Sequence, residues 1–477
     1  HSVNLGGRTL NYTVTAGTMP IRTDTGELEA NMFYIAYTAD PDPGRARPLT
    51  FSFNGGPGSS SVWLHLGALG PKRVQMNDDG SLPPAPYKLV DNPYTWLDQT
   101  DLVFIDPVGT GFSRAARPDQ ARKFFSVEGD IQSVGEFIRL YLTRSKRWTS
   151  PLFLAGESYG TTRAAGLSGH LIDRGIALNG IMLISTVLNF QTIRFTKGND
   201  LPYILFLPSY TAAAWYHKKL EPGLQADLTE ALRAAEKFAS DEYPNALAKG
   251  DRLTGAERDA IATKLASLTG LSKSYVDSAD LRIEIFAFIK ELLRDRKQVV
   301  GRLDSRISGV DVDRRGTSET PDFDPSLTAI RPPYTAAFNQ YVRNDLGYSS
   351  DLTYHILGGG IGQWNWGDQN GFADTSEALR QAFAKNPFMK LYIGFGYYDL
   401  ATPYFAAQYT LTHMGLPEPA LKNITERYYE AGHMYYVHLE SLKKLKKDVD
   451  EFIRTAIPNP ESDGNSGNSI GKQQPKR

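Results

Sequence analysis

The sequence contains no cysteine. Disulfide bonds, thiolate nucleophiles and cysteine metal sites are therefore excluded, and redox chemistry gives no indication of the compartment. Long apolar runs are also lacking, because no window approaches the roughly 20 apolar residues of a membrane-spanning helix. Charge of one sign is not in excess either, since the formal net charge is −1. We therefore expect no nucleic acid and no membrane as a partner.

The composition is that of an ordinary globular protein, with 41% hydrophobic and 22% charged residues among 477. The chain begins at His1 rather than at a methionine, as a mature or trimmed protein would. We therefore expect a removed signal peptide and a secreted or periplasmic location. The sequence does not indicate an oligomeric state.

Short apolar runs predict a mostly parallel central sheet. Residues 3–38 alternate extended stretches with glycine turns, which favours an antiparallel hairpin or meander. Later runs are strand-length and mostly apolar, as strands buried on both faces are; they are 49–53, 102–105, 152–155, 181–184 and 391–395. Residues 159–172 have helical spacing, so a strand, a sharp turn and a helix follow one another at residue 158.

Between residues 190 and 355 the pattern changes to helical periods. Thr254 and Glu257 form a predicted capping box, and Gly270 is a predicted helix stop. We interpret this region as a helical cap inserted into the sheet domain. The predicted organisation is a first sheet part at 1–189, the cap at 190–355, a second sheet part at 356–460, and a disordered polar tail at 461–477.

The sequence Gly156-Glu157-Ser158-Tyr159-Gly160 has the pattern G-x-S-x-G. Flanking glycines allow a strained turn that exposes a serine hydroxyl. By itself the pattern fits a plain glycine-rich turn equally well. An apolar strand before it and a helix after it are the context of a nucleophile elbow. We therefore predict an α/β-hydrolase fold, with a central mostly parallel sheet and an inserted helical cap, and Ser158 as its nucleophile.

A serine nucleophile needs a base, and the base needs a carboxylate to orient it. Asp399 follows the apolar run 391–395, and His433 follows Gly432 in a second loop. The order Ser, Asp, His is the one that this fold uses. The other seven histidines lack such a context and are expected to be structural or exposed.

A developing oxyanion needs backbone donors. The N–H of Tyr159, directly after the serine, is the first candidate. The glycine-rich loop at residues 54–58 follows a predicted strand and offers the second. A tight structural turn is the plain alternative for this loop, and the two interpretations are compatible.

The sequence resembles the serine carboxypeptidases, peptidase family S10. The motifs that carry the resemblance run from about residue 50 to 440 in the family's order; they are Asn54-Gly-Gly-Pro-Gly-Ser-Ser60, Asp106-Pro-Val-Gly-Thr-Gly-Phe-Ser113, Gly156-Glu-Ser-Tyr-Gly160, Asp399 and Gly432-His-Met434. Ser59 stands where the family often has cysteine, and the family's usual disulfides are absent, as in a bacterial-type member.

The resemblance implies release of single amino acids from the C-termini of peptide substrates, without metal or cofactor. It implies a triad of Ser158, Asp399 and His433, and an oxyanion hole formed by the amides of Gly56 and Tyr159. It further implies that the substrate's terminal carboxylate is bound by Asn54, Gly55 and Glu157. A carboxyl group holds a carboxylate only if one of them keeps a proton, so we expect peptidase activity to favour acid.

One departure from the family leaves an alternative open. Many members carry a second Glu about fourteen residues after the Asn of N-G-G-P-G, and this sequence has Ala68 there. A serine esterase, amidase or acyltransferase with the same triad is therefore the second hypothesis. A non-catalytic binding protein is the third, and the intact Ser, Asp and His disfavour it.

Overall fold

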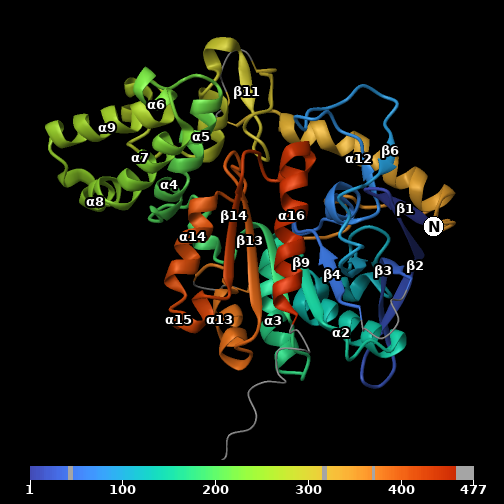
Figure 1. Cartoon of the computed structure of the whole chain (residues 1–477). Helices are drawn as coiled ribbons and strands as arrows, with labels where there is room; N and C mark the ends of the chain where they lie inside the picture. The colour runs from blue at the N-terminus through green and yellow to red at the C-terminus, as the bar shows by residue number, and fades with distance from the viewer. Residues whose placement is uncertain (41–46, 314–317, 319, 368–370, 458–477) are drawn as a thin grey trace, which may run out of the picture.

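The computed structural model describes residues 1–40, 47–313, 318, 320–367 and 371–457. Its centre is a ten-stranded sheet of order β1-β2-β3-β7-β4-β9-β10-β13-β14, with β8 paired to β3 (Figure 1). The strands are β1 Ser2–Leu5, β2 Arg8–Arg22, β3 Leu28–Ala39, β4 Leu49–Phe53, β7 Asp101–Ile105, β8 Arg114–Ala115, β9 Leu152–Ser158, β10 Gly180–Thr186, β13 Lys390–Gly396 and β14 Ile424–Tyr429. All five predicted apolar strands are present.

The sheet is parallel at its centre and antiparallel at one edge. Strands β7, β4, β9, β10, β13 and β14 run parallel to their neighbours. The first three strands form the predicted antiparallel meander, and β3 also pairs antiparallel with β7. Because β9 and β13 run the same way, their carboxyl ends meet at one edge. The residues that follow these two strands are Tyr159 and Tyr397, so the nucleophile turn and the loop of Asp399 share that edge.

A group of helices between β10 and β13 packs around a core of its own (residues such as Phe238 and Leu265). Figure 1 shows it apart from the helices around the sheet. The predicted capping box at Thr254 and Glu257 is present, and Gly270 ends the helix with φ 69°. The elements are α4 Leu201–Leu205, α5 Leu207–Tyr216, α6 Pro222–Gln225, α7 Leu228–Ser240, α8 Glu242–Lys249, α9 Gly255–Thr269, α10 Lys273–Ser278, α11 Ile285–Glu291, β11 Gln298–Val300 and β12 Ser308–Val310.

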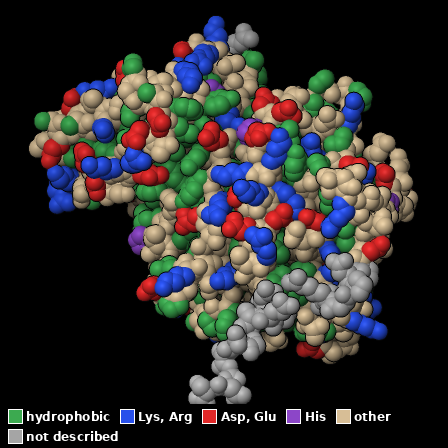
Figure 2. Space-filling model, viewed as in Figure 1, with side chains coloured by type: hydrophobic (Ala, Val, Ile, Leu, Met, Phe, Trp, Pro, Cys, Tyr) green, Lys and Arg blue, Asp and Glu red, His purple; other side chains and the backbone are tan. Residues whose placement is uncertain are grey.

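The surface carries charges of both signs. Figure 2 shows Lys and Arg interspersed with Asp and Glu over the viewed face, in keeping with a net charge of −1. In the described part of the chain, no helix combines the length and the apolar character needed to cross a bilayer.

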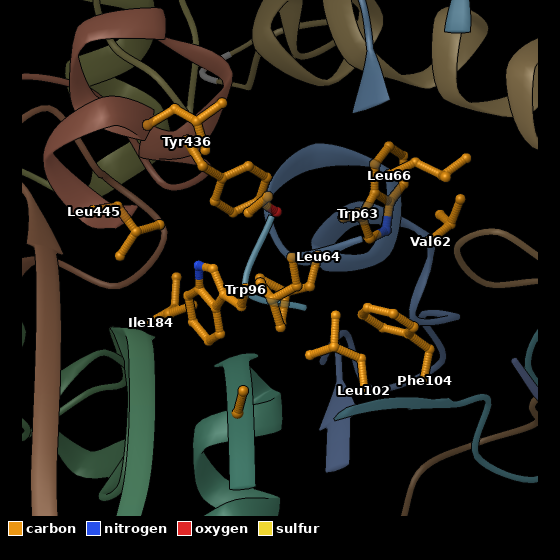
Figure 3. Packing of buried hydrophobic residues seen from close by; sticks show 14 of the residues in the cluster. Val62, Trp63, Leu64, Leu66, Trp96, Leu102, Phe104, Ile184, Tyr436 and Leu445 are labelled. Carbon is orange, nitrogen blue, oxygen red and sulfur yellow. The ribbon is translucent and has the colours of Figure 1, made fainter. Parts of the chain in front are cut away.

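Successive residues of the strands face two different cores. Leu154 packs with α2 Val127–Ser145, α3 Tyr159–Ile172, α13 Ser376–Lys385 and α14 Tyr404–His413 on one face. Phe153 packs on the other face, with α12 Pro325–Asn344 and α16 Leu439–Ala456. Figure 3 shows part of this second core, where several segments converge: Trp63, Leu64, Trp96, Leu102, Phe104, Ile184 and Tyr436. The sheet is thus buried on both faces, which explains its apolar strands.

Helix α12 lies within the predicted cap at 190–355, yet Tyr334 and Phe338 of this helix belong to the core of the sheet. The part with a separate core therefore spans α4 to β11. The division at 189, 355 and 460 stays a prediction, and the predicted tail at 461–477 lies outside the described residues.

The remaining elements are short: α1 Val62–Leu64, β5 Lys72–Val74, β6 Leu89–Asp91, α15 Glu418–Leu421 and short π- or 3₁₀-helices at 65–69, 118–124, 190–192, 250–252, 294–296 and 435–437.

Candidate active site

Ser158 occupies a strained turn between β9 and α3. Its φ of 60° and ψ of −130° are unfavourable for a residue with a Cβ atom. The turn also requires glycine on both sides of the serine. A Cβ at Gly160 would lie 2.8 Å from the carbonyl oxygen of Phe53, and one at Gly156 would collide with the carbonyl oxygen of Gly160. This tight packing holds Ser158 at the end of β9, where it lines a pocket.

Asp399 and His433 lie in contact. Oδ2 of Asp399 is 2.7 Å from Nδ1 of His433, and the aspartate is fully buried. The N–H groups of Ala401 and Thr402 donate to the other oxygen, Oδ1, at 2.7 and 3.0 Å. The hydroxyl of Thr402 donates to Oδ2 at 2.8 Å. The carboxylate is therefore oriented toward the imidazole by three donors of its own loop.

The environment of His433 makes it a stronger base than a free imidazole. Burial lowers the pKa of His433, but the charge of Asp399 and the hydrogen bond to it outweigh that effect, and the pKa is raised. The backbone of this residue is also fixed. Its N–H donates to the carbonyl of Leu303 at 2.6 Å, and its carbonyl accepts from the hydroxyl of Ser185 at 2.5 Å.

The glycine-rich loop packs directly on the start of α3. A Cβ at Gly55 would collide with the backbone nitrogen of Tyr159, so only glycine allows this approach. Tyr159 is the first residue of α3, and its N–H has no acceptor within the helix. Gly56, with φ 100°, follows in the loop and lines the same pocket as Ser158. The backbone geometry thus suits two oxyanion donors.

A buried arginine fixes this loop to α3. Arg163 is 1% exposed and forms an ion pair of 2.7 Å with Asp130. Its other nitrogen donates to the carbonyl of Asn54 at 2.6 Å. The guanidinium therefore connects the glycine-rich loop, α2 and α3.

Glu157 is buried beside His433 and Asn54. Burial is the largest cause that raises the pKa of Glu157, to about 7, although His433, a hydrogen bond from Tyr436 and the nearby Asn54 each lower it. The amide oxygen of Asn54 accepts from the N–H of Leu64 at 3.0 Å. The amide nitrogen of Asn54 is buried and has no close hydrogen-bond partner among the described residues, although it lies near enough to Glu157 to lower the pKa of that carboxyl group. It is a donor available to a ligand.

The predicted residues gather around one pocket. Ser158, His433 and Glu157 line it together with the loop 54–56, and Asp399 lies behind His433 without reaching it. Most other lining residues are apolar: Trp63, Leu303, Leu327, Ile330, Leu357, Ala401 and Met434. Ala68 is fully buried and does not line the pocket. The structure thus places all eight predicted site residues at one location, while their roles stay predictions.

Several residues of the site were not predicted from the sequence. Thr402 and Arg163 carried a local signal, because one follows Asp399 by three positions and the other is a charged residue among small residues of a helix. Tyr436 and Arg302 carried none. Tyr436 bonds to Glu157 and Arg302 lines the pocket, and both come from segments whose positions depend on long-range packing.

Comparisons with known proteins agree with this geometry. The sequence matches the serine carboxypeptidase family over residues 8–443. It is 31% identical over 165 residues to serine carboxypeptidase-like 36 of Arabidopsis thaliana, which covers 33% of this chain and 32% of that protein. It is 33% identical over 159 residues to the pheromone-processing carboxypeptidase KEX1 of Saccharomyces cerevisiae, strain JAY291, which covers 30% of this chain and 20% of that protein.

A solved structure supports the fold. The crystal structure of KEX1(delta)p, a prohormone-processing carboxypeptidase from Saccharomyces cerevisiae, superimposes with a TM-score of 0.56 and 16% identity, over 92% of this chain and 91% of that one. The α/β-hydrolase fold predicted from the sequence is thereby confirmed. The alignments with the two curated relatives span about a third or less of their lengths. The family match over 8–443 nevertheless covers most of the chain, which belongs to the serine carboxypeptidase family.

Proposed function

We propose that the protein is a serine carboxypeptidase that releases C-terminal amino acids from peptides. The observation that carries the proposal is one pocket that joins Ser158 and His433 to a buried carboxyl group with a raised pKa, that of Glu157. Ser158 and His433 carry out the acyl transfer. Glu157 supplies recognition of a free carboxylate beside the reacting bond.

The chemistry uses each group in turn. The Nδ1–H of His433 is held by Asp399, so Nε2 is free to take the proton of Ser158 as its Oγ attacks the scissile carbonyl carbon. The amides of Gly56 and Tyr159 stabilise the resulting oxyanion. His433 then protonates the leaving amine, and the acyl group remains on Ser158. Water, activated by the same imidazole, releases the shortened peptide.

Recognition of the C-terminus requires a proton on Glu157. Two carboxylates in contact cannot both stay ionised at low cost, whereas a neutral carboxyl group donates a hydrogen bond to the substrate. The free amide nitrogen of Asn54 is a second donor, and Gly55 lets the substrate approach the loop closely. Apolar lining residues favour uncharged side chains in most of the pocket.

Hydrolysis of an N-blocked Phe-Leu dipeptide and of its C-terminal amide tests the proposal. We expect the free acid to be cleaved best on the acid side of about pH 7, where Glu157 is protonated, until protonation of His433 removes the base at lower pH. Faster cleavage of the amide at every pH would contradict a carboxypeptidase and leave the nucleophile in place.

A serine esterase, amidase or acyltransferase is the second candidate, and Ala68 favours it. The side chain of Ala68 is buried in the apolar core, so no second carboxyl group supports Glu157 from this position. The hydroxyl of Tyr436 is the hydrogen-bond partner of Glu157 instead. Preference for a simple ester over the free acid at acidic pH would support this alternative.

Replacement of Glu157 by glutamine is expected to remove the alkaline decline of peptidase activity. In the wild type, kcat/KM for the free acid should fall as the pH rises through about 7, because Glu157 ionises and repels the substrate. Glutamine stays a neutral donor at all pH values. The variant also loses a negative charge that raises the pKa of His433, so its acid limb should move to lower pH. The measurement is a pH profile of kcat/KM from about pH 4 to 9.

Two controls belong with this profile. The amide substrate lacks the carboxylate, so the wild type should cleave it without an alkaline decline. Tyr436→Phe removes a hydrogen bond that lowers the pKa of Glu157, so its alkaline limb should move up by about one pH unit. An unchanged alkaline limb in Glu157→Gln would show that Glu157 does not set the pH dependence.

We also propose a secreted or periplasmic location. Glu157 must carry a proton to bind the substrate carboxylate, and it carries one below about pH 7. This requirement suits a compartment that becomes acidic. Fractionation of the producing cells with immunoblotting tests this, and a purely cytoplasmic signal would contradict it.

A further inference from the structure

Arg302 brings a positive charge without a counter-ion into the pocket of Ser158. It lines that pocket and is partly exposed. Within the described part of the chain, its guanidinium has no ion pair and no hydrogen bond, although the backbone N–H and carbonyl of this residue are both bonded. A half-buried charge among apolar walls is costly unless a partner arrives.

The backbone of Arg302 is fixed between the two loops that carry Asp399 and His433. Its carbonyl accepts from the N–H of Leu400 at 3.1 Å, and the carbonyl of Leu303 accepts from the N–H of His433 at 2.6 Å. The N–H of Arg302 donates to Asp324 at 3.2 Å. The side chain therefore begins from a rigid segment beside the reacting groups, as a preorganised binding residue requires.

The nearby carboxylates are engaged elsewhere. Asp324 caps the start of α12, where it accepts from the N–H groups of Ser326 and Leu327. Asp304 forms an ion pair of 2.6 Å with Arg306 and also accepts from a loop N–H. No acidic side chain of this segment is left to neutralise Arg302.

The charge lies on the His433 side of the pocket. Arg302 is among the groups that affect the pKa of His433, which it lowers. Leu303, the next residue in the chain, binds the backbone of His433 and lines the pocket together with Arg302. Arg302 therefore belongs to the side of the pocket that carries the base.

We propose that Arg302 is a specificity-determining residue that binds an acidic side chain on a substrate residue flanking the scissile bond. The proposal rests on the proposed carboxypeptidase function. A guanidinium pairs with carboxylates in a planar, two-point geometry, and low local polarity strengthens the pair. The rest of the pocket is apolar, so Arg302 extends the substrate range to Asp and Glu rather than replacing the apolar preference.

The test compares charged and uncharged side chains of equal shape. The substrates are N-blocked dipeptides in two series, X-Leu and Phe-X, where X is Glu or Gln, at about pH 5.5 and low salt. Each enzyme's ratio of kcat/KM for Glu over Gln is the readout, because protein concentration and folding cancel in it. We expect the wild type to favour Glu by about tenfold in one series. Arg302→Met should bring that ratio to about one or below, and Arg302→Lys should keep part of it.

Each outcome decides the proposal. A wild-type ratio near one in both series, or an unchanged ratio in Arg302→Met, would overturn it. An equal loss on Glu and Gln would also overturn it, because Arg302 would then serve a group common to all substrates, such as the terminal carboxylate. If the wild type cleaves no dipeptide, the proposed function has failed separately, and the ratio is then measured on N-blocked Glu and Gln α-methyl esters, where it decides in the same way.

Discussion

Replacement of Ser158 by glycine is expected to abolish hydrolysis and to make the protein more stable. Loss of the nucleophile should lower kcat by about 10⁶-fold, since the remaining triad members contribute little without it. The backbone at this position has φ 60° and ψ −130°, which costs about 1–3 kcal/mol for a residue with a Cβ atom. Glycine adopts this conformation freely, and its larger entropy when unfolded offsets about 0.5–1 kcal/mol of the gain.

Ser158→Ala is the matched control, because it removes the same hydroxyl and keeps the Cβ. Both variants should be inactive and unreactive toward a fluorophosphonate probe. Only glycine should raise the free energy of unfolding, by about 1 kcal/mol in urea or thermal denaturation. Equal stability of the two variants would mean that the turn stores no strain. Substantial residual activity in both would assign the nucleophile elsewhere.

The strain at Ser158 has a visible structural cause. Gly55 approaches the nitrogen of Tyr159 so closely that no side chain fits between the loop and the start of α3. Arg163 stabilises the same arrangement through its ion pair with Asp130 and its hydrogen bond to the carbonyl of Asn54. The surrounding packing therefore imposes the turn, and the exposed hydroxyl is its consequence.

The parts of the fold that the sequence predicted well are those with local signals. Strands buried on both faces are mostly apolar, so the runs at 102–105 in β7 and 181–184 in β10 were recognisable from their composition. The capping box of α9 is read from Thr254 and Glu257, three positions apart. The nucleophile turn is likewise encoded within five residues, and chain order alone then selected Asp399 and His433.

The parts that the sequence did not predict depend on distant segments. Tyr436 donates to Glu157 across 279 positions, and its partner could not be inferred from its neighbours. Arg302 reaches the pocket because its flanking residue Leu303 binds the N–H of His433, 130 positions away in the chain. Helix α12 has the same helical pattern as the inserted helices, so periodicity could not tell that it packs on the sheet.

Replacement of Asp399 by asparagine is expected to lower kcat by about 10⁴-fold with little change in the fold. The loop leaves the new amide only one favourable orientation. Two backbone N–H groups, of Ala401 and Thr402, donate to Oδ1, so the amide oxygen must stay there. The NH₂ group then takes the place of Oδ2 and donates to Nδ1 of His433. The proton of the imidazole moves to Nε2, which can no longer accept the proton of Ser158.

This prediction tests whether the Asp399 carboxylate is the acceptor of the Nδ1 proton. Steady-state kinetics on the N-blocked Phe-Leu dipeptide measure the loss, and circular dichroism checks that the fold is kept. Thr402→Val is the matched control: it removes the hydroxyl that bonds to Oδ2 and lies 3.2 Å from Nδ1 of His433, leaves both backbone donors, and should cost less than about tenfold. A loss of less than tenfold in Asp399→Asn would contradict the assigned role. A loss close to 10⁴-fold, with the control little affected, means that His433 requires a charged acceptor at Nδ1, which the loop holds in place.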